Sequence, residues 1–205
     1  MIFGRRRVDN VTVCVHPSML LIDQRRKSDP MSLSLYQSSV PVFERSLAAF
    51  LGILDKAEAH AQARKFDPTN YLAIRLAPDM FPLTRQIQSF CDNAKNTSLR
   101  LAGAQAPVIA DNETTFAELR ARIQTTLDHL KTIDAEEVDA GVERNIVFPV
   151  GPTLKMKMRG ADYLMHFALP NFYFHLTTAY DILRSAGVEI GKRDFLGAIP
   201  GISPA

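Results

Sequence analysis

Beyond residue 30, hydrophobic residues recur at steps of three and four along much of the chain, which is the pattern of amphipathic helices. The first run predicts a helix over residues 35–63, ending before the turn sequence FDPTN. A second run, opened by the sequence LAPDMFP, extends from Met80 to Ala94, and a third covers residues 116–133. These three runs predict three long helices, each with one buried face.

Two shorter patterns refine this prediction. Asp111 or Asn112 is the expected N-cap of the third helix, with Glu113 in its first turn. In the sequence RNIVFPVGPTLKMKMRG, hydrophobic residues alternate with other residues on both sides of a Gly-Pro pair. This period of two around a turn predicts a short β-hairpin.

A fourth helix is predicted over residues 161–187, ending at Gly187, a residue type that favours the left-handed conformation found after helices. Pro170 is expected to bend it, because proline lacks a backbone N–H and its ring collides with the carbonyl four residues earlier. We therefore predict an all-α protein, a four-helix bundle with a small β-hairpin before the last helix, formed by residues 31–205.

Composition places the chain among globular proteins and narrows the classes of function. It is 46% hydrophobic and 22% charged, and no apolar run is long enough to span a bilayer. Residues 1–30 hold six of the 24 Lys and Arg and three of the 22 Asp and Glu, which leaves residues 31–205 with a net charge of −1. A nearly neutral body argues against nucleic-acid binding. Two separated cysteines favour a reducing, cytoplasmic compartment.

Residues 1–30 show no helical or strand period. We interpret them as a disordered extension, or as sequence upstream of a true initiator at Met31. A basic targeting segment is the alternative, although Asp9, Asp23 and Asp29 count against it.

The candidate chemistry lies in the sequence HFALPNFYFH, residues 166–175. Asn171 and His175 are four residues apart and share the core-facing side of the last helix, whereas His166, nine residues before His175, points to the opposite side of a straight helix. Asp79 is also expected to face the core, from the start of the second helix. Each polar group has a structural alternative: Asp79 as an N-cap, Asn171 as a partner for carbonyls freed by Pro170, and His175 as a core histidine.

No glycine-rich phosphate loop, HExxH, CxxC or GxSxG motif is present. Instead, LYQSSVPVFERSLAAFLGILDKAEAHA, RLAPDMFPLTRQIQSFCDNAK and LPNFYFHLTTAYDILR resemble a domain-of-unknown-function branch of the DinB/YfiT-like metalloenzyme superfamily, over about residues 31–198. The resemblance implies a four-helix bundle, often dimeric, with a divalent metal (Zn, Ni, Mn or Fe) held by three histidines. One histidine comes from helix two and two, four residues apart, come from the last helix.

Carried over to this chain, the resemblance places His175 at the second histidine of the last helix, Asn171 at the first, and Asp79 near the helix-two position. His175 and Asp79 are the metal ligands that it implies. Because only one of three histidines is present, we expect a modified polar pocket without a tightly bound metal. His166 and Tyr173 are its second-layer candidates.

Two functions from different classes fit this sequence. The first is a small-molecule transferase, isomerase or hydrolase, with His175 as base or ligand, Asp79 orienting it and Asn171 donating to a developing oxyanion. The second is a non-catalytic bundle that binds a ligand or a partner. In either case we expect a small-molecule ligand and a homodimer, with no nucleic-acid or membrane partner.

Overall fold

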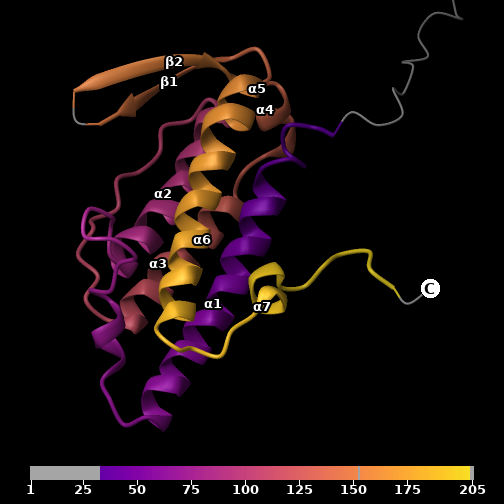
Figure 1. Ribbon diagram of the computed structural model, residues 1–205. Helices are drawn as coiled ribbons and strands as arrows, with labels where there is room; N and C mark the ends of the chain where they lie inside the picture. Colours follow the sequence, from indigo (N-terminus) through magenta and orange to yellow (C-terminus); the bar gives the residue numbers. More distant parts are fainter. Residues whose placement is uncertain (1–32, 152, 204–205) are drawn as a thin grey trace, which may run out of the picture. The chain divides into compact units, whose positions relative to one another are not determined.

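A computed structural model describes residues 33–151 and 153–203 of the chain, so the interpretation of residues 1–30 lies outside the described residues. The described part is mostly helical, with one antiparallel two-stranded hairpin (Figure 1). None of its helices is long and apolar enough to cross a membrane. In chain order the elements are α1 (Val40–Ala63), the 3-10 turn η2 (Pro68–Tyr71), α2 (Leu83–Ala102), α3 (Phe116–Lys131), α4 (Ala135–Asp139), β1 (Asn145–Val150), β2 (Leu154–Arg159), α5 (Gly160–Tyr163), the π-helical turn η3 (Leu164–Ala168), α6 (Leu169–Ser185) and α7 (Lys192–Leu196).

The hydrophobic core lies between the long helices. Helix α2 contacts both α3 and α6, and α1 contacts α3. Aromatic rings join three of these helices: Phe172 of α6 lies edge-on to Phe43 of α1, with ring centroids 4.7 Å apart, and 6.3 Å from Phe90 of α2. Edge-to-face rings at such distances add to the free energy gained by burying them. The predicted hydrophobic faces therefore meet in one core.

The predicted helices are confirmed, but the first two begin later than the sequence suggested. Residues 35–39 form turns, and α1 begins at Val40, with Pro41 in its first turn. Helix α2 begins at Leu83, so the segment before it is a loop. The predicted N-cap of α3 is wrong: Thr115 caps the helix in a reciprocal capping box with Glu118. Asp111 is instead engaged in ion pairs with arginines of α2 and α3.

The last helical stretch is interrupted, as Pro170 suggested, but the interruption lies just before the proline. Residues 164–168 form a π-helical turn in which the N–H of Leu169 donates to the carbonyl of Leu164. Pro170 then stands in the first turn of α6, where its missing N–H is tolerated. Gly187, with φ of 91°, follows the end of α6 in the left-handed conformation that the sequence predicted.

The hairpin is confirmed, and its registry pairs Ile146 with Met158 and Phe148 with Met156. Two glycines bring its base against the end of α2. A Cβ on Gly160 would collide with the carbonyl oxygen of Gly141, and a Cβ on Gly141 would collide with that of Leu101. Only residues without side chains allow these backbones to approach so closely.

We predict that Gly160→Ala destabilises the protein by about 1–3 kcal/mol or more, because the added methyl meets backbone that has no room to move. Gly52→Ala is the matched control: Gly52 lies within α1 with nothing near its Cβ position, so alanine should stabilise the helix by about 0.5–1 kcal/mol. Urea unfolding measures both changes. Equal midpoints for Gly160→Ala and the wild type would contradict the close approach.

Candidate functional site

Polar side chains pair across the contact between α2 and α6. The imidazole Nδ1 of His175 lies 2.7 Å from Oε1 of Gln86, and Nδ2 of Asn171 donates to Oδ1 of Asn93 at 3.2 Å. Gln86 and Asn93 are seven residues apart, so they lie on one side of α2. The later residue of α2 pairs with the earlier residue of α6, so the two helices are antiparallel.

A third pair continues this row of contacts. Arg100, seven residues after Asn93, donates from Nη1 to the hydroxyl of Tyr163 at 3.0 Å. Tyr163 and Asn171 are eight residues apart, which in a regular helix would separate them by about 80°. The extra residue of the π turn brings them to nearly the same side. We call the three pairs Gln86–His175, Asn93–Asn171 and Arg100–Tyr163 the polar seam.

The contacts of Gln86 determine which nitrogen of His175 carries its proton. Gln86 is buried, and its Nε2 donates to the carbonyl of Phe81 at 3.1 Å, so its Oε1 faces His175. An amide oxygen only accepts hydrogen bonds. Nδ1 of His175 is therefore the protonated nitrogen of the neutral ring, and Nε2 keeps its lone pair.

The surroundings of His175 favour this neutral ring. The ring is half-buried and lies nearly parallel to Phe81, with centroids 6.3 Å apart and an interplanar angle of 15°. Burial lowers the pKa of His175 below its usual value, and the positive charge of Arg85 lowers it further. The guanidinium of Arg85 also lies over the Phe81 ring, 5.6 Å from its centre. The imidazole of His175 is thus held in one orientation, and its lowered pKa favours the neutral ring.

The structure brings together two of the residues predicted from sequence, Asn171 and His175, on one side of α6. Asp79 does not join them: it is exposed in the loop before α2, so the expectation that it faces the core is wrong. The loop extends to Pro82, which leaves Asp79 outside the helix whose face it was expected to share. His166, expected in the second layer of the pocket, is instead exposed on the π turn, and Tyr173 is half-buried against Phe172.

Sequence reasoning missed Gln86, the α2 residue that contacts His175. Its signal was present, because Gln86 lies three residues after Leu83 and four before Phe90, within the hydrophobic face of α2. A glutamine at such a position must find a buried partner. Asn93 carried a weaker signal, since it lies at the edge of that face.

The donor atoms at the seam do not fit the three-histidine metal site that the resemblance implies. His175 is its one imidazole, the amide oxygen of Gln86 is committed to His175, and amide oxygens are weak ligands for Zn, Ni, Mn or Fe. Within residues 33–151 and 153–203, no three His, Cys, Asp or Glu side chains are grouped to hold a metal ion. The groups present at the seam are therefore suited to proton transfer and hydrogen bonding by side chains.

The protein is mostly helical, and the contact between α2 and α6 includes the half-buried imidazole of His175. Residues 35–196 match the family described as a domain of unknown function (DUF1993), and the chain belongs to this family. The chain is also similar to a solved structure, a DinB family member protein from Shewanella denitrificans. The two are 42% identical over 83% of this chain and 96% of that one, with a TM-score of 0.76. No curated protein matches. The resemblance to a DUF branch of the DinB-like superfamily is confirmed.

The lowered pKa of His175 predicts a pH-dependent stability. In the unfolded chain this histidine takes up a proton near its ordinary pKa of about 6.5, whereas the folded protein takes it up only at lower pH. The unfolded state therefore binds more protons as the pH falls below about 6.5, and the wild type should lose stability relative to His175→Gln. Urea unfolding at several values between pH 7.5 and 5 measures this difference. A difference that does not change with pH would contradict the shift.

Proposed function

We propose that this chain is a DinB-like four-helix bundle and that the seam around Gln86, Asn171 and His175 is a site for small-molecule chemistry, with His175 as general base. The observation that supports this proposal most strongly is the contact of His175 Nδ1 with Gln86 Oε1, at 2.7 Å. It supports a fixed tautomer in which Nε2 has a lone pair available to a substrate. A base with a pKa somewhat below neutral is in its active form at physiological pH.

In this proposal, Gln86 takes the helix-two position of the three-residue site that the DinB resemblance implies, a place that the sequence assigned to Asp79. Gln86 positions His175 and has no titratable proton of its own. Phe81 supports the same role, because its carbonyl fixes the amide of Gln86 and its ring stacks on the imidazole. Two independent contacts thus restrict the rotation of His175 before any ligand arrives.

Asn171 supplies a neutral donor one helical turn from the base. One of its two Nδ2 hydrogens is directed to Asn93, whose own Nδ2 donates to the carbonyl of Ser89. The second hydrogen has no partner among the described residues, so Asn171 suits the stabilisation of a ligand oxygen that gains negative charge. Removal of a proton by His175 and stabilisation of an oxyanion by Asn171 are steps shared by hydrolases, isomerases and some transferases.

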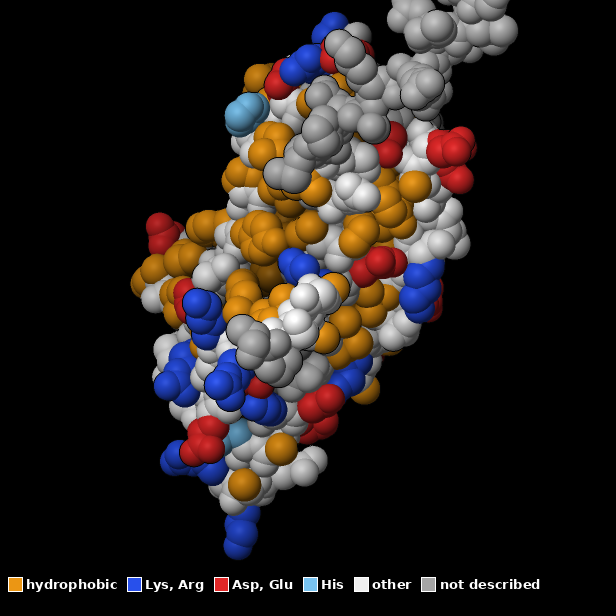
Figure 2. Space-filling model, turned by 90° about the vertical axis from the view of Figure 1, so that its right-hand side faces the viewer, with side chains coloured by type: hydrophobic (Ala, Val, Ile, Leu, Met, Phe, Trp, Pro, Cys, Tyr) orange, Lys and Arg blue, Asp and Glu red, His pale blue; other side chains and the backbone are white. Residues whose placement is uncertain are grey.

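The second candidate function is non-catalytic binding of a ligand or partner. It is favoured by two exposed aromatic residues beside His175: Phe81 is 49% exposed and Phe174 is 55% exposed. Phe174 lies edge-on to the imidazole, with centroids 5.3 Å apart. Hydrophobic side chains also gather across the middle of the face seen in Figure 2. Exposed apolar groups of this kind are common at binding surfaces, and they support the homodimer that the resemblance implies.

An activity screen against hydrolase, isomerase and thiol-transferase substrates tests the first candidate. His175→Gln should lower any activity found by about 10²-fold or more, because general bases contribute about 10²–10⁴-fold. The wild-type activity should fall as the pH is lowered through the reduced pKa of His175. His166→Gln is the matched control, since that histidine is exposed on the preceding π turn.

The stability of His175→Leu separates the two roles. A histidine kept for structure should cost about 1–3 kcal/mol on replacement, because Gln86 loses its buried partner. A histidine kept for function at a cost to stability should show a smaller loss, because its replacement relieves that cost. An activity that survives in His175→Gln, together with a large loss of stability in His175→Leu, would contradict the proposed base.

A further inference from the structure

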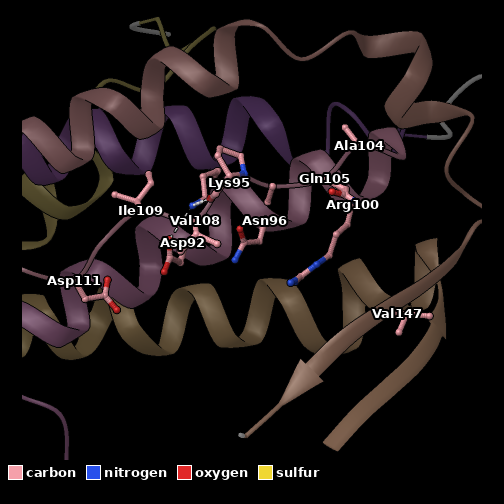
Figure 3. A pocket seen from close by; sticks show the side chains of 12 residues that line it. Asp92, Lys95, Asn96, Arg100, Ala104, Gln105, Val108, Ile109, Asp111 and Val147 are labelled. Atoms are coloured by element: carbon pink, nitrogen blue, oxygen red, sulfur yellow. Dashed lines mark hydrogen bonds and ion pairs between the residues drawn. The ribbon is translucent and has the colours of Figure 1, made fainter. Parts of the chain in front are cut away.

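A cavity of about 510 Å³ opens beside α2, on the part of the helix remote from His175. Its wall is formed by the second half of α2, by the crossover of residues 103–115 and by Val147 of β1 (Figure 3). Asn96 and Arg100 extend into it from the same side of α2, one helical turn apart. Arg100 and Gln86 are fourteen residues apart, or about 21 Å along the helix, so the Arg100 end of this cavity is distinct from the proposed base.

The carboxylates that line the cavity are already neutralised. Asp92 Oδ1 lies 3.2 Å from Lys95 Nζ and 3.0 Å from Arg122 Nη2, close enough to pair the charges although the angles are not those of hydrogen bonds. Asp111 is paired with Arg122, at 3.0 Å, and with Arg85. These two acids therefore give the cavity no net negative charge that would attract a cation.

Arg100 is different, because it has no carboxylate partner among the described residues. Its contact with the Tyr163 hydroxyl uses one of the five N–H donors of the guanidinium. Tyr163 is 1% exposed and packs on Phe148 and Phe167, with centroids 4.8 and 5.8 Å away, so it holds that end of Arg100 in place. The amide of Asn96 is likewise without a hydrogen-bond partner in the described part of the chain.

A second cavity, of about 190 Å³, shares Arg100, Ala104 and Val147 with the first and adds Arg144 to the wall. Arg144 donates to the carbonyl of Leu101, and its guanidinium lies over Gly103, where a Cβ would be 3.1 Å from its central carbon. That contact offsets the partial negative charge at the end of α2. Two guanidinium groups without carboxylate partners in the described residues thus border two neighbouring cavities that share part of their walls.

From this arrangement we infer that the region around Arg100 binds the oxyanion group, carboxylate or phosphate, of a small organic anion. The planar fork of a guanidinium matches two oxygens of either group and binds them in pairs. Asn96 adds a neutral donor on the same wall. The hydrophobic residues Val108, Ile109 and Val147 line the rest of the larger cavity and would contact the organic part of the ligand.

The test is a titration of ¹⁵N-labelled protein followed by NMR, with sodium phosphate in one series and sodium succinate in another, at ionic strength held constant with NaCl. We expect saturable shifts for the side chains of Arg100 and Asn96. Arg100→Gln should weaken binding by about tenfold or more. Arg184→Gln is the matched control, because Arg184 also lies in the last turn of its helix but is exposed and lines neither cavity.

Saturation by succinate alone identifies a carboxylate site, and saturation by phosphate alone identifies a phosphate site; both support the proposal. Asn96→Asp provides a second variant that places a negative charge in the wall without removing Arg100, and it should abolish binding even if Arg100→Gln does not fold. The proposal is overturned if neither probe saturates the wild type, or if the affinity of Asn96→Asp or of folded Arg100→Gln equals that of the wild type.

Discussion

Polar side chains lie buried or half-buried between α2 and the last helical stretch, and their pairing across this contact restricts how the last helix can lie. A buried donor or acceptor left unpaired costs about 1–3 kcal/mol. Three residues of α2, namely Gln86, Asn93 and Arg100, each have a polar partner across this contact. Sliding α6 along α2 by one turn would break all three contacts together, so the seam adds to hydrophobic packing in setting the position of α6.

The π turn makes the third contact of the seam compatible with the first two. Without its extra residue, Tyr163 would be rotated away from the side of the helix that carries Asn171. Its presence places Tyr163 against both Arg100 and Phe148 of the hairpin. The same short segment thus links the seam to the hairpin, whose base is held by Gly141 and Gly160. His175 at one end of the seam and Arg100 at the other are both held by the contact between α2 and the last helical stretch.

The helices and the hairpin were predictable from sequence because hydrophobic period reports directly which face of an element is buried. Helix starts were less predictable, because they depend on competing polar contacts. The capping box of Thr115 and Glu118 was visible as a sequence pattern, but Asp111 is an equally good cap in isolation. Only the folded structure shows that Asp111 forms ion pairs with Arg85 and Arg122.

The candidate site was half predictable for a related reason. Asn171 and His175 belong to one helix, so their shared face follows from their spacing. Their partners come from α2, and the spacing within one helix does not show which residue of another lies opposite. Asp79 was chosen by its expected place at the start of the second helix, whereas that helix begins later and the position opposite His175 is taken by Gln86. The buried Arg122 was missed too, because its ion pairs join two helices and the crossover.

The protonation of the His175 ring tests the central claim most directly. Correlation of imidazole ¹⁵N and ¹H resonances at pH 7.5 distinguishes a proton on Nδ1 from a proton on Nε2. The contact with Gln86 predicts a neutral His175 with its proton on Nδ1, and a loss of that preference in Gln86→Ala. A charged ring at this pH, or a neutral ring protonated on Nε2 in the wild type, would contradict the account of the seam.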